Sequence, residues 1–369
     1  MKNNMKSVAE WKKLVEEFQK PHLGRALWQC ANTLLPVLGI WIALYFVYPV
    51  SLWSSILLAA LAGLFLVRTF IIFHDCGHGS FFKNKKANDA LGFFTGMLTF
   101  TPYHHWKWEH AVHHATNGDL DKRGIGDVWT MTVEEYLTSS RRVKISYRLL
   151  RNPFILFGLA PLFLFFVLER FPSSQSKPRE RRSVYLMNLT LILWGTVMSL
   201  IYGFIPWLII QTVMMGVAGG CGIWLFYVQH QFEDTYWAQG KDWDFTTAAM
   251  EGSSYYKLPK IMQWFSGNIG FHHIHHLNPM VPNYNLERCH HSDPFFQVAP
   301  ELNLWSSIKT IKFRLWDEAN CKMISFGELK NQLANFCLCF YVINIQQQYK
   351  HVKYTIGQNI SFVNTTNYA

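Results

Sequence analysis

The sequence predicts an all-α, polytopic membrane protein, and two observations lead to this prediction. Of the 369 residues, 50% are hydrophobic and only 16% are charged. The two kinds are segregated, so that long apolar runs alternate with stretches dense in lysine, arginine and histidine. This segregation is typical of a chain that crosses a bilayer several times. We therefore expect four transmembrane helices in two hairpins, together with interfacial helices and a helical cap on the cytosolic side.

The first twenty residues show no pattern of a cleavable signal peptide. The stretch "MKNNMKSVAEWKKLVEEFQK" instead predicts a short amphipathic helix. Its apolar face would consist of Val8, Trp11, Leu14, Val15 and Phe18. We expect this face to lie on the membrane surface.

Four apolar runs are long enough to cross a bilayer, which takes about 20 residues. They cover residues 27–48, 53–73, 184–205 and 206–228. The connectors "YPVSL" and "GFIP" join them into two pairs and contain no lysine or arginine, whereas the flanks are rich in both. The positive-inside tendency therefore puts both connectors outside, and both termini and the long middle segment in the cytosol. Arg68, near the cytosolic end of the second run, is expected to snorkel, with an interior orientation as the alternative.

Two further apolar stretches are too short or too interrupted for a simple span. Residues 91–100 cannot cross the bilayer, and residues 153–168 contain two prolines and a glycine. If residues 153–168 crossed, the basic loop "ERFPSSQSKPRERR" would lie outside, against the charge rule. The histidines after the fourth run would also lie opposite the earlier ones. We therefore expect both stretches to be interfacial or re-entrant.

The remaining composition places the chain in a membrane rather than on nucleic acid. The formal net charge is +10, but the basic residues flank apolar segments, which favours a membrane-adjacent cytosolic face. No stretch resembles a nucleic-acid-binding module. Seven cysteines form no CxxC pair, so a reducing compartment is expected rather than a disulfide framework. We expect one domain over residues 1–330 and a C-terminal tail of unknown role over residues 331–369.

Histidines gather in three clusters, each next to an apolar run on the predicted cytosolic side. Their sequences are "HDCGH", "HAVHH" and, within "GNIGFHHIHHLNP", "HHIHH". In a helix, spacings of three and four residues bring the imidazoles of each cluster onto one face. The candidate ligands are His74 and His78; His110, His113 and His114; His272, His275 and His276; and a ninth, His230, in "FYVQHQFED".

A single HxxxH pair is weak evidence for a metal, and buried histidines are often hydrogen-bonded core residues. Three regularly spaced clusters argue against that reading and against a pH sensor, which needs no regular spacing. One zinc takes about four protein ligands, so these histidines could hold two metals with room for a further ligand on each. Two redox-active irons would then suit oxygen chemistry. A zinc-binding transporter or protease is the alternative of another class, but HExxH is absent and the spans contain almost no ionisable residues.

Other polar residues near the clusters are assigned supporting roles or none. Candidates for orienting the ligands are Asp75, Glu109, Asn117, Asp119, Asp121, Asp127 and Asn268. No site role is assigned to His22, His104, His105, His273, His290, His291 and His351.

The histidine motifs resemble those of the membrane fatty acid desaturases. The similar stretches are "HDCGHGSFF", "HHWKWEHAVHHATNGDLD", "FYVQHQFED" and "GNIGFHHIHHLNPMVPNYNLERCH", within residues 20–330. The chain most resembles bacterial and cyanobacterial acyl-lipid desaturases of the delta-5 and delta-12 (omega-6) kind. The stretches "DKRGIGDVWTMTVEEY" and "EGSSYYKLPK" point to the acyl-lipid branch. By position, the eight cluster histidines match the three histidine boxes, and His230 falls where related enzymes place an additional ligand.

The resemblance implies a non-haem di-iron centre, facing the cytosol, that uses O₂ and two electrons to insert a cis double bond into the acyl chain of a membrane lipid. A narrow apolar tunnel would grip the chain by burial, at about 0.8 kcal/mol per CH₂. The sequence contains no fused cytochrome b5, no GxGxxG fold and no iron–sulfur motif. An external donor is therefore expected, either ferredoxin or flavodoxin, whose acidic surface would suit the basic face. Hydroxylation or ketolation of a lipid or carotenoid by the same chemistry is the alternative.

Overall fold

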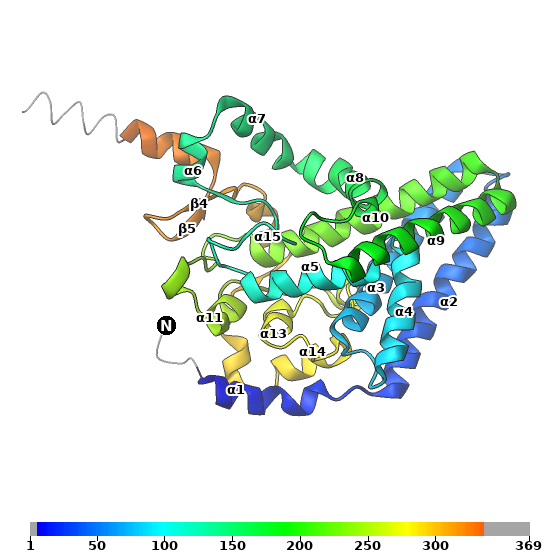
Figure 1. Ribbon diagram of the computed structural model, residues 1–369, viewed down its shortest axis with the longest axis horizontal. Coiled ribbons are helices and arrows are strands. Elements are labelled where there is room, and N and C mark those ends of the chain that lie inside the picture. Colours follow the sequence, from blue (N-terminus) through cyan, green and yellow to red (C-terminus); the bar gives the residue numbers. More distant parts are fainter. Residues whose placement is uncertain (1–5, 336–369) are drawn as a thin grey trace, which may run out of the picture. The chain divides into compact units, whose positions relative to one another are not determined.

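Four long helices dominate the computed structural model, which describes residues 6–335 (Figure 1). Within these residues, each of the four is long and apolar enough to span a membrane. They are α2 (Leu23–Val47), α3 (Leu52–His78), α9 (Pro178–Tyr202) and α10 (Phe204–His230). The predicted spans are thereby confirmed, and the chain is an integral membrane protein. Both α3 and α10 continue past their apolar runs and end on candidate ligands, His78 and His230.

The helices form the expected hairpins, and α3 packs on α10 at their centre. The close approach requires a glycine at position 63. A Cβ atom there would lie 2.8 Å from the carbonyl oxygen of Met214 and 2.8 Å from the Cβ atom of Val217. Small residues commonly allow transmembrane helices to approach in this way. Gly63 therefore fixes the spacing of the two helices that end at the histidine clusters.

Replacing Gly63 with alanine is expected to destabilise the protein, because the new methyl group meets backbone that cannot move aside. Overpacking of this kind costs about 1–3 kcal/mol. Gly39 of α2 is the matched control, since a Cβ atom there would meet nothing within 4 Å. Thermal denaturation of the detergent-solubilised chain should show a lower midpoint for Gly63→Ala and none of this loss for Gly39→Ala. Equal midpoints for the two variants would contradict the close contact.

Shorter elements build the remainder of the chain, which is mostly helical as predicted. The helices are α1 (Val8–Val15), α4 (Lys85–Leu98), α5 (Tyr103–Thr116), α6 (Val133–Thr138), α7 (Arg141–Leu150), α8 (Ala160–Phe166), α11 (Phe245–Met250), α12 (Lys260–Phe265), α13 (His272–Leu277), α14 (Asn283–His290) and α15 (Leu304–Thr310). Short helical turns are η2 (Glu16–Gln19), η3 (Ile155–Leu159), η4 (Leu168–Arg170), η5 (Gly240–Asp242) and η6 (Pro294–Gln297). The strands are β1 (Met131–Thr132), β2 (Tyr255–Tyr256), β3 (Glu301–Leu302), β4 (Leu315–Asp317) and β5 (Lys322–Ile324). β1 pairs with β4 and β2 with β3, both in parallel.

The described residues up to Met323 belong to one compact unit and those from Ile324 to a second, in which residues 326–335 are helical. The predicted boundary near residue 330 stays a prediction. Most of the predicted tail, residues 336–369, lies outside the described residues.

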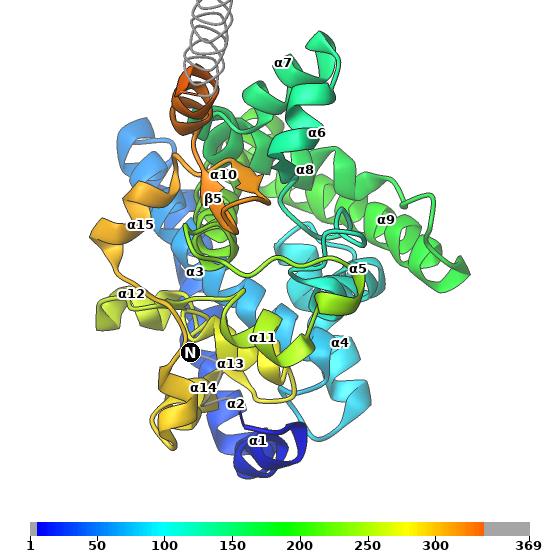
Figure 2. The ribbon, with the colours of Figure 1, turned by 90° about the vertical axis from the view of Figure 1, so that its left-hand side faces the viewer.

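The apolar face of α1 packs on the cap, so the prediction that it lies on the membrane surface is wrong. Trp11, Val15 and Phe18 are buried in one cluster with Phe271 and Ile274. Helical periodicity shows that a face is apolar, but it does not tell a protein surface from a lipid surface. The N-terminal segment therefore packs against α13, the helix formed by "HHIHH". Figure 2 shows α1 at its lower edge, below α13 and α14.

Arg68 faces the protein interior, so the snorkelling prediction is also wrong and the alternative holds. Its side chain is buried and donates a hydrogen bond to Thr33 Oγ1 at 3.0 Å and another to the carbonyl oxygen of Trp264. Its guanidinium also lies 4.1 Å from the centre of the Trp264 ring. Arg68 thus joins α2, α3 and α12 near the cytosolic end predicted for α3.

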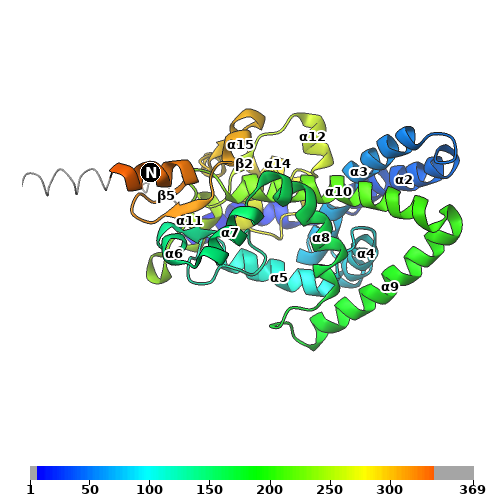
Figure 3. The same cartoon turned by 90° about the horizontal axis from the view of Figure 1, so that it is seen from above.

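Residues 153–168 do not form a straight span. They include η3 and α8, and the helical segment Ile155–Arg170 is bent by 63° from α7 (Figure 3). Such a pair is either a broken span or a re-entrant loop, so the re-entrant arrangement stays a prediction. Both η3 and α8 pack against α10, and a Cβ atom at Gly220 of α10 would lie 2.7 Å from the carbonyl oxygen of Phe157. Residues 91–100 fall within α4 and the turn that follows it.

Candidate metal centre

Four elements that are distant in the sequence bring the nine candidate histidines together. The last turns of α3 carry His74 and His78, and α10 ends at His230. The other two elements, α5 and α13, carry three of the candidate histidines each, with identical spacing. Eight of the nine histidines belong to two groups whose ring nitrogens are close enough to bind a common ion.

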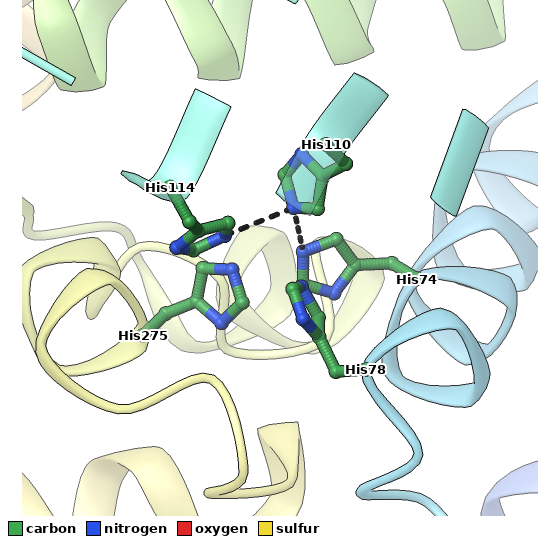
Figure 4. A group of neighbouring side chains, drawn as sticks. All are labelled: His74, His78, His110, His114 and His275. Atoms are coloured by element: carbon green, nitrogen blue, oxygen red, sulfur yellow. Dashed lines mark hydrogen bonds between the residues drawn. The ribbon is translucent and has the colours of Figure 1, made fainter. Parts of the chain in front are cut away.

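The first group contains five histidines: His74, His78, His110, His114 and His275. One ring nitrogen from each lies within 4.8 Å of the others. Figure 4 shows the five rings turned toward one another from α3, α5 and α13. We call this group the first histidine cluster.

The second histidine cluster contains His113, His230 and His276, whose ring nitrogens also lie within 4.8 Å of one another. His272 joins it, because its Nε2 atom lies 2.9 Å from Nε2 of His230 and 3.1 Å from Nε2 of His276. The nine predicted histidines thus divide into sets of five and four.

The division follows helix geometry. In α5 the residues four apart, His110 and His114, face the first cluster, and His113 turns to the second. In α13 the residues four apart, His272 and His276, face the second cluster, and His275 turns to the first. Residues at i and i+4 lie above one another on a helix, and the residue at i+3 is rotated away from them. Each three-histidine motif therefore contributes to both clusters.

Acceptors behind the rings determine which ring nitrogen faces each cluster. Nδ1 of His113 lies 2.5 Å from Oδ1 of Asp127, and Nδ1 of His230 lies 3.3 Å from the carbonyl oxygen of Gly252. A carbonyl oxygen only accepts, so Nδ1 of His230 carries the proton and its Nε2 atom presents a lone pair to the cluster. Ligating histidines in metalloproteins are held in this way by carboxylates and carbonyls.

Asp75 orients His74 in the same manner. Oδ1 of Asp75 lies 3.1 Å from Nδ1 of His74, and Oδ2 accepts hydrogen bonds from the backbone and side-chain nitrogens of Asn283 at 2.7 and 2.8 Å. All three residues are buried. The carboxylate is therefore fixed on both sides, and it fixes the ring in turn.

The donor set fits metal ions, because imidazole nitrogens from separate elements converge in one buried space. Nε2 of His74 lies 3.0 Å from Nε2 of His110 although Nδ1 of His74 already faces a carboxylate. Among the candidate ligands, three buried Nε2 atoms have no hydrogen-bond partner in the described part of the chain, those of His78, His113 and His275. Unpartnered buried polar atoms are costly, and a bound cation removes this cost.

Burial also favours the neutral form of five of the candidate imidazoles, as metal binding requires. Desolvation, aided by the neighbouring histidines, lowers the pKa values of the cap histidines well below the ordinary value. This holds for His110, His114, His272, His275 and His276.

The histidines without a predicted site role lie outside both clusters wherever the structure describes them. Nε2 of His273 is 3.1 Å from Nδ1 of His290, and Nδ1 of His22 accepts a hydrogen bond from the backbone of Arg25. Of the predicted orienting residues, Asp75 and Asp127 contact ligand candidates, while Asn268 bonds instead to Gln263 and to the backbone of Asn283. Asn283 and the Gly252 carbonyl were not predicted, because no local sequence pattern marks either of them.

An apolar cavity of about 640 Å³ adjoins the clusters. Its wall includes His74, His110 and His272 together with apolar side chains of α3, α8 and α10. It extends along α3 to Leu66, eight residues before His74, which is about 12 Å at 1.5 Å per residue. This volume is within the range of about 300–1,000 Å³ that is usual for ligand sites. We call it the acyl-sized cavity.

Comparisons with known proteins identify the family to which this chain is similar. Residues 51–303 match the family model described as "Fatty acid desaturase". A protein named "Fatty acid desaturase" from Bacillus subtilis (strain 168) is 47% identical over 320 residues, covering 86% of this chain and 91% of the relative. The "sn-1 oleoyl-lipid 12-desaturase" of Synechocystis sp. is 28% identical over 240 residues, or 62% of this chain and 65% of the relative.

A plant relative extends the comparison. The "sn-2 acyl-lipid omega-3 desaturase (ferredoxin), chloroplastic" of Helianthus annuus is 28% identical over 235 residues, covering 59% of this chain and 50% of the relative. Both the matched family model and the Bacillus relative cover most of the present chain. With its buried histidine clusters and four apolar helices, this chain belongs to the membrane fatty acid desaturase family.

Proposed function

We propose that the chain is an acyl-lipid desaturase that holds two iron ions in its histidine clusters. The first cluster would hold one ion through His74, His78, His110, His114 and His275. The second would hold the other through His113, His230, His272 and His276. The single observation that best supports the proposal is the wall of the acyl-sized cavity, which contains histidines of both clusters.

Iron suits these clusters better than zinc. A structural zinc site is closed by about four ligands, and the first cluster offers five imidazoles. Imidazole also suits iron, and bound iron would supply, with O₂ and two electrons, an oxidant able to attack an unactivated C–H bond. In the overall reaction two neighbouring methylenes lose one hydrogen each, O₂ takes up these hydrogens with two electrons and two protons, and two waters form.

The residues of this chain orient the reactants and exclude competing ones. Asp75, Asp127 and the Gly252 carbonyl hold three rings with their Nε2 atoms toward the clusters. The acyl-sized cavity would hold the lipid chain extended past His74 and His110, with burial contributing about 0.8 kcal/mol per CH₂. A chain gripped in this way presents one pair of methylenes to the clusters and displaces water from them.

The cytosolic orientation, the acyl-lipid substrate and the electron donor form part of the same proposal. Lipid-linked chains are favoured because the relatives from Synechocystis and Helianthus are named as acting on acyl groups of lipids. The name of the Helianthus relative includes ferredoxin. The net charge of +10 would attract an acidic carrier such as ferredoxin or flavodoxin to a cytosolic face.

The test is expression of the full chain in a host whose membranes lack unsaturated chains, followed by gas chromatography–mass spectrometry of the lipids. We expect a new monoene that is two hydrogens lighter than its saturated precursor. If the host is supplied with monoenes, a diene would equally support the proposal. A product that instead gains one oxygen would support the hydroxylase alternative, and the absence of any new product from membrane-inserted protein would reject both.

A further inference from the structure

One acidic side chain lies at the end of an otherwise apolar side of the acyl-sized cavity. The segment from η3 to η4 forms this side with Leu156, Ala160, Leu164, Phe165, Leu168 and Glu169. The first five side chains are apolar and suit a lipid chain. The carboxyl group of the sixth belongs to neither histidine cluster. A polar group in such a position is costly, so its presence calls for a role.

Glu169 is buried and has an oxygen atom without a partner. The residue is only 8% exposed, and within the described residues nothing forms a hydrogen bond with its Oε2 atom. No ion pair in the described part of the chain includes it. Burial penalises the charged form of a carboxyl group, so an unpaired one is more stable with its proton. Glu169 can therefore store a proton in the cavity wall.

The other charged side chains that line the cavity leave Glu169 unpaired. Among the described residues they are Asp127, Arg151 and Glu109. Asp127 is bonded to a histidine of the second cluster, and Arg151 to a glutamine side chain and a backbone carbonyl. Glu109 is close enough to interact electrostatically with Glu169. Two neighbouring carboxyl groups do not both ionise readily. Because Glu109 is only partly buried, the proton is favoured on Glu169.

Arg170 can stabilise the carboxylate of Glu169 once the proton has left. Its guanidinium donates hydrogen bonds to Asn188 Oδ1 at 3.0 Å and to the carbonyl oxygen of Phe100. Its Nε atom is buried and, within residues 6–335, has no hydrogen-bond partner. The two neighbours form no ion pair, but they interact electrostatically. A nearby positive charge lowers the free-energy cost of releasing a proton, so Glu169 can donate its proton as well as hold it.

The proposed reaction needs protons in a space from which the substrate displaces water. Forming two waters from O₂ takes up two protons in addition to the two hydrogens of the lipid chain. An acyl chain that fills the cavity excludes the bulk water that would otherwise deliver these protons. The wall that contains Glu169 also contains His74 and His110. A proton stored there is in place before the chain enters.

We propose that Glu169 donates one of the two protons that are consumed when O₂ is reduced to water. This rests on the proposed function and names a further residue for the same reaction. The O–H bond of the carboxyl group breaks, the carboxylate keeps the electron pair, and the proton joins an oxygen atom derived from O₂. The transfer occurs directly or through one bound water. Solvent water re-enters after the product leaves and returns a proton to the carboxylate.

The first test is Glu169→Gln in the purified full chain, with reduced ferredoxin and vesicles of saturated phosphatidylglycerol. Glutamine has nearly the same shape but carries no acidic proton. General acids typically contribute about 10²–10⁴-fold, so kcat should fall by about 100-fold or more with wild-type KM and iron content. Glu169→Asp restores a carboxyl group and should recover part of the lost kcat. Glu134→Gln, at an exposed position of α6 outside the cavity, is the control and should match the wild type.

Infrared spectroscopy of the resting full chain gives a readout that does not depend on turnover. The spectrum of the wild type minus that of Glu169→Gln should show the carbonyl stretch of a protonated carboxylic acid, and this band should shift in D₂O. Glu134→Gln should leave it unchanged. The assignment is overturned if Glu169→Gln keeps the wild-type kcat, keeps the infrared band, or loses activity together with its iron. A wild type that shows the band but forms no double bond instead rejects the proposed function.

Discussion

Replacing His113 with alanine is expected to abolish double-bond formation, and His275→Ala should do the same. His113→Ala removes an imidazole from the second histidine cluster, and His275→Ala removes one from the first, so each variant weakens the binding of one of the two proposed ions. Removing a residue that is only hydrogen-bonded to a metal ligand typically lowers metal affinity or activity by about 10–100-fold. Removing the ligand itself should therefore lower activity by more than about 100-fold. The measurements are the monoene content of host lipids and the iron content of the purified variants.

His291→Ala is the control for these two substitutions. His291 lies in the same part of the chain but is exposed and outside both clusters. It should retain iron and form product as the wild type does. Full activity in either His113→Ala or His275→Ala, with the protein correctly inserted, would remove that residue from the proposed ligand set.

Filling the acyl-sized cavity should abolish product while leaving the metal in place. Gly222 of α10 lines this cavity, and a Cβ atom there would meet nothing within 4 Å. Gly222→Phe would therefore project a ring into space that the acyl chain needs, without touching a histidine cluster. We expect near-complete loss of desaturation with wild-type iron content, because a chain that cannot enter is not brought to the oxidant.

The matched control is Gly158→Phe in η3. A Cβ atom at Gly158 also meets nothing within 4 Å, but the residue is exposed and does not line the cavity. It should keep its activity. An active Gly222→Phe variant would mean that the lipid chain follows another route to the clusters.

The sequence predicted the spanning helices and the clustered histidines because both leave local patterns. The apolar runs identified all four spans, although each helix begins before its apolar run does. The spacing within "HAVHH" and "HHIHH" predicted that each trio shares a helix face. It did not predict that His113 and His275 would cross to the opposite cluster, since that depends on how α5 and α13 face each other.

Contacts between residues far apart in the chain could not be predicted from the sequence. Asn283 binds a carboxylate 208 residues earlier in the chain, and Gly252 contributes a backbone carbonyl that any residue would have. Arg68 was expected to snorkel to the membrane interface, and the apolar face of α1 to lie on the membrane surface. Both predictions were wrong, because the spacing of apolar residues along a helix shows that a face is buried but not what covers it. In the folded protein Trp264 lies beside Arg68, and Phe271 packs against the apolar face of α1.

The most direct test is an anomalous-scattering crystal structure of active, full-length protein, recorded at the iron absorption edge. We predict two iron peaks per chain, one among the five imidazoles of the first histidine cluster and one among the four of the second. A single peak, zinc in place of iron in active protein, or iron bound away from these nine side chains would contradict the account.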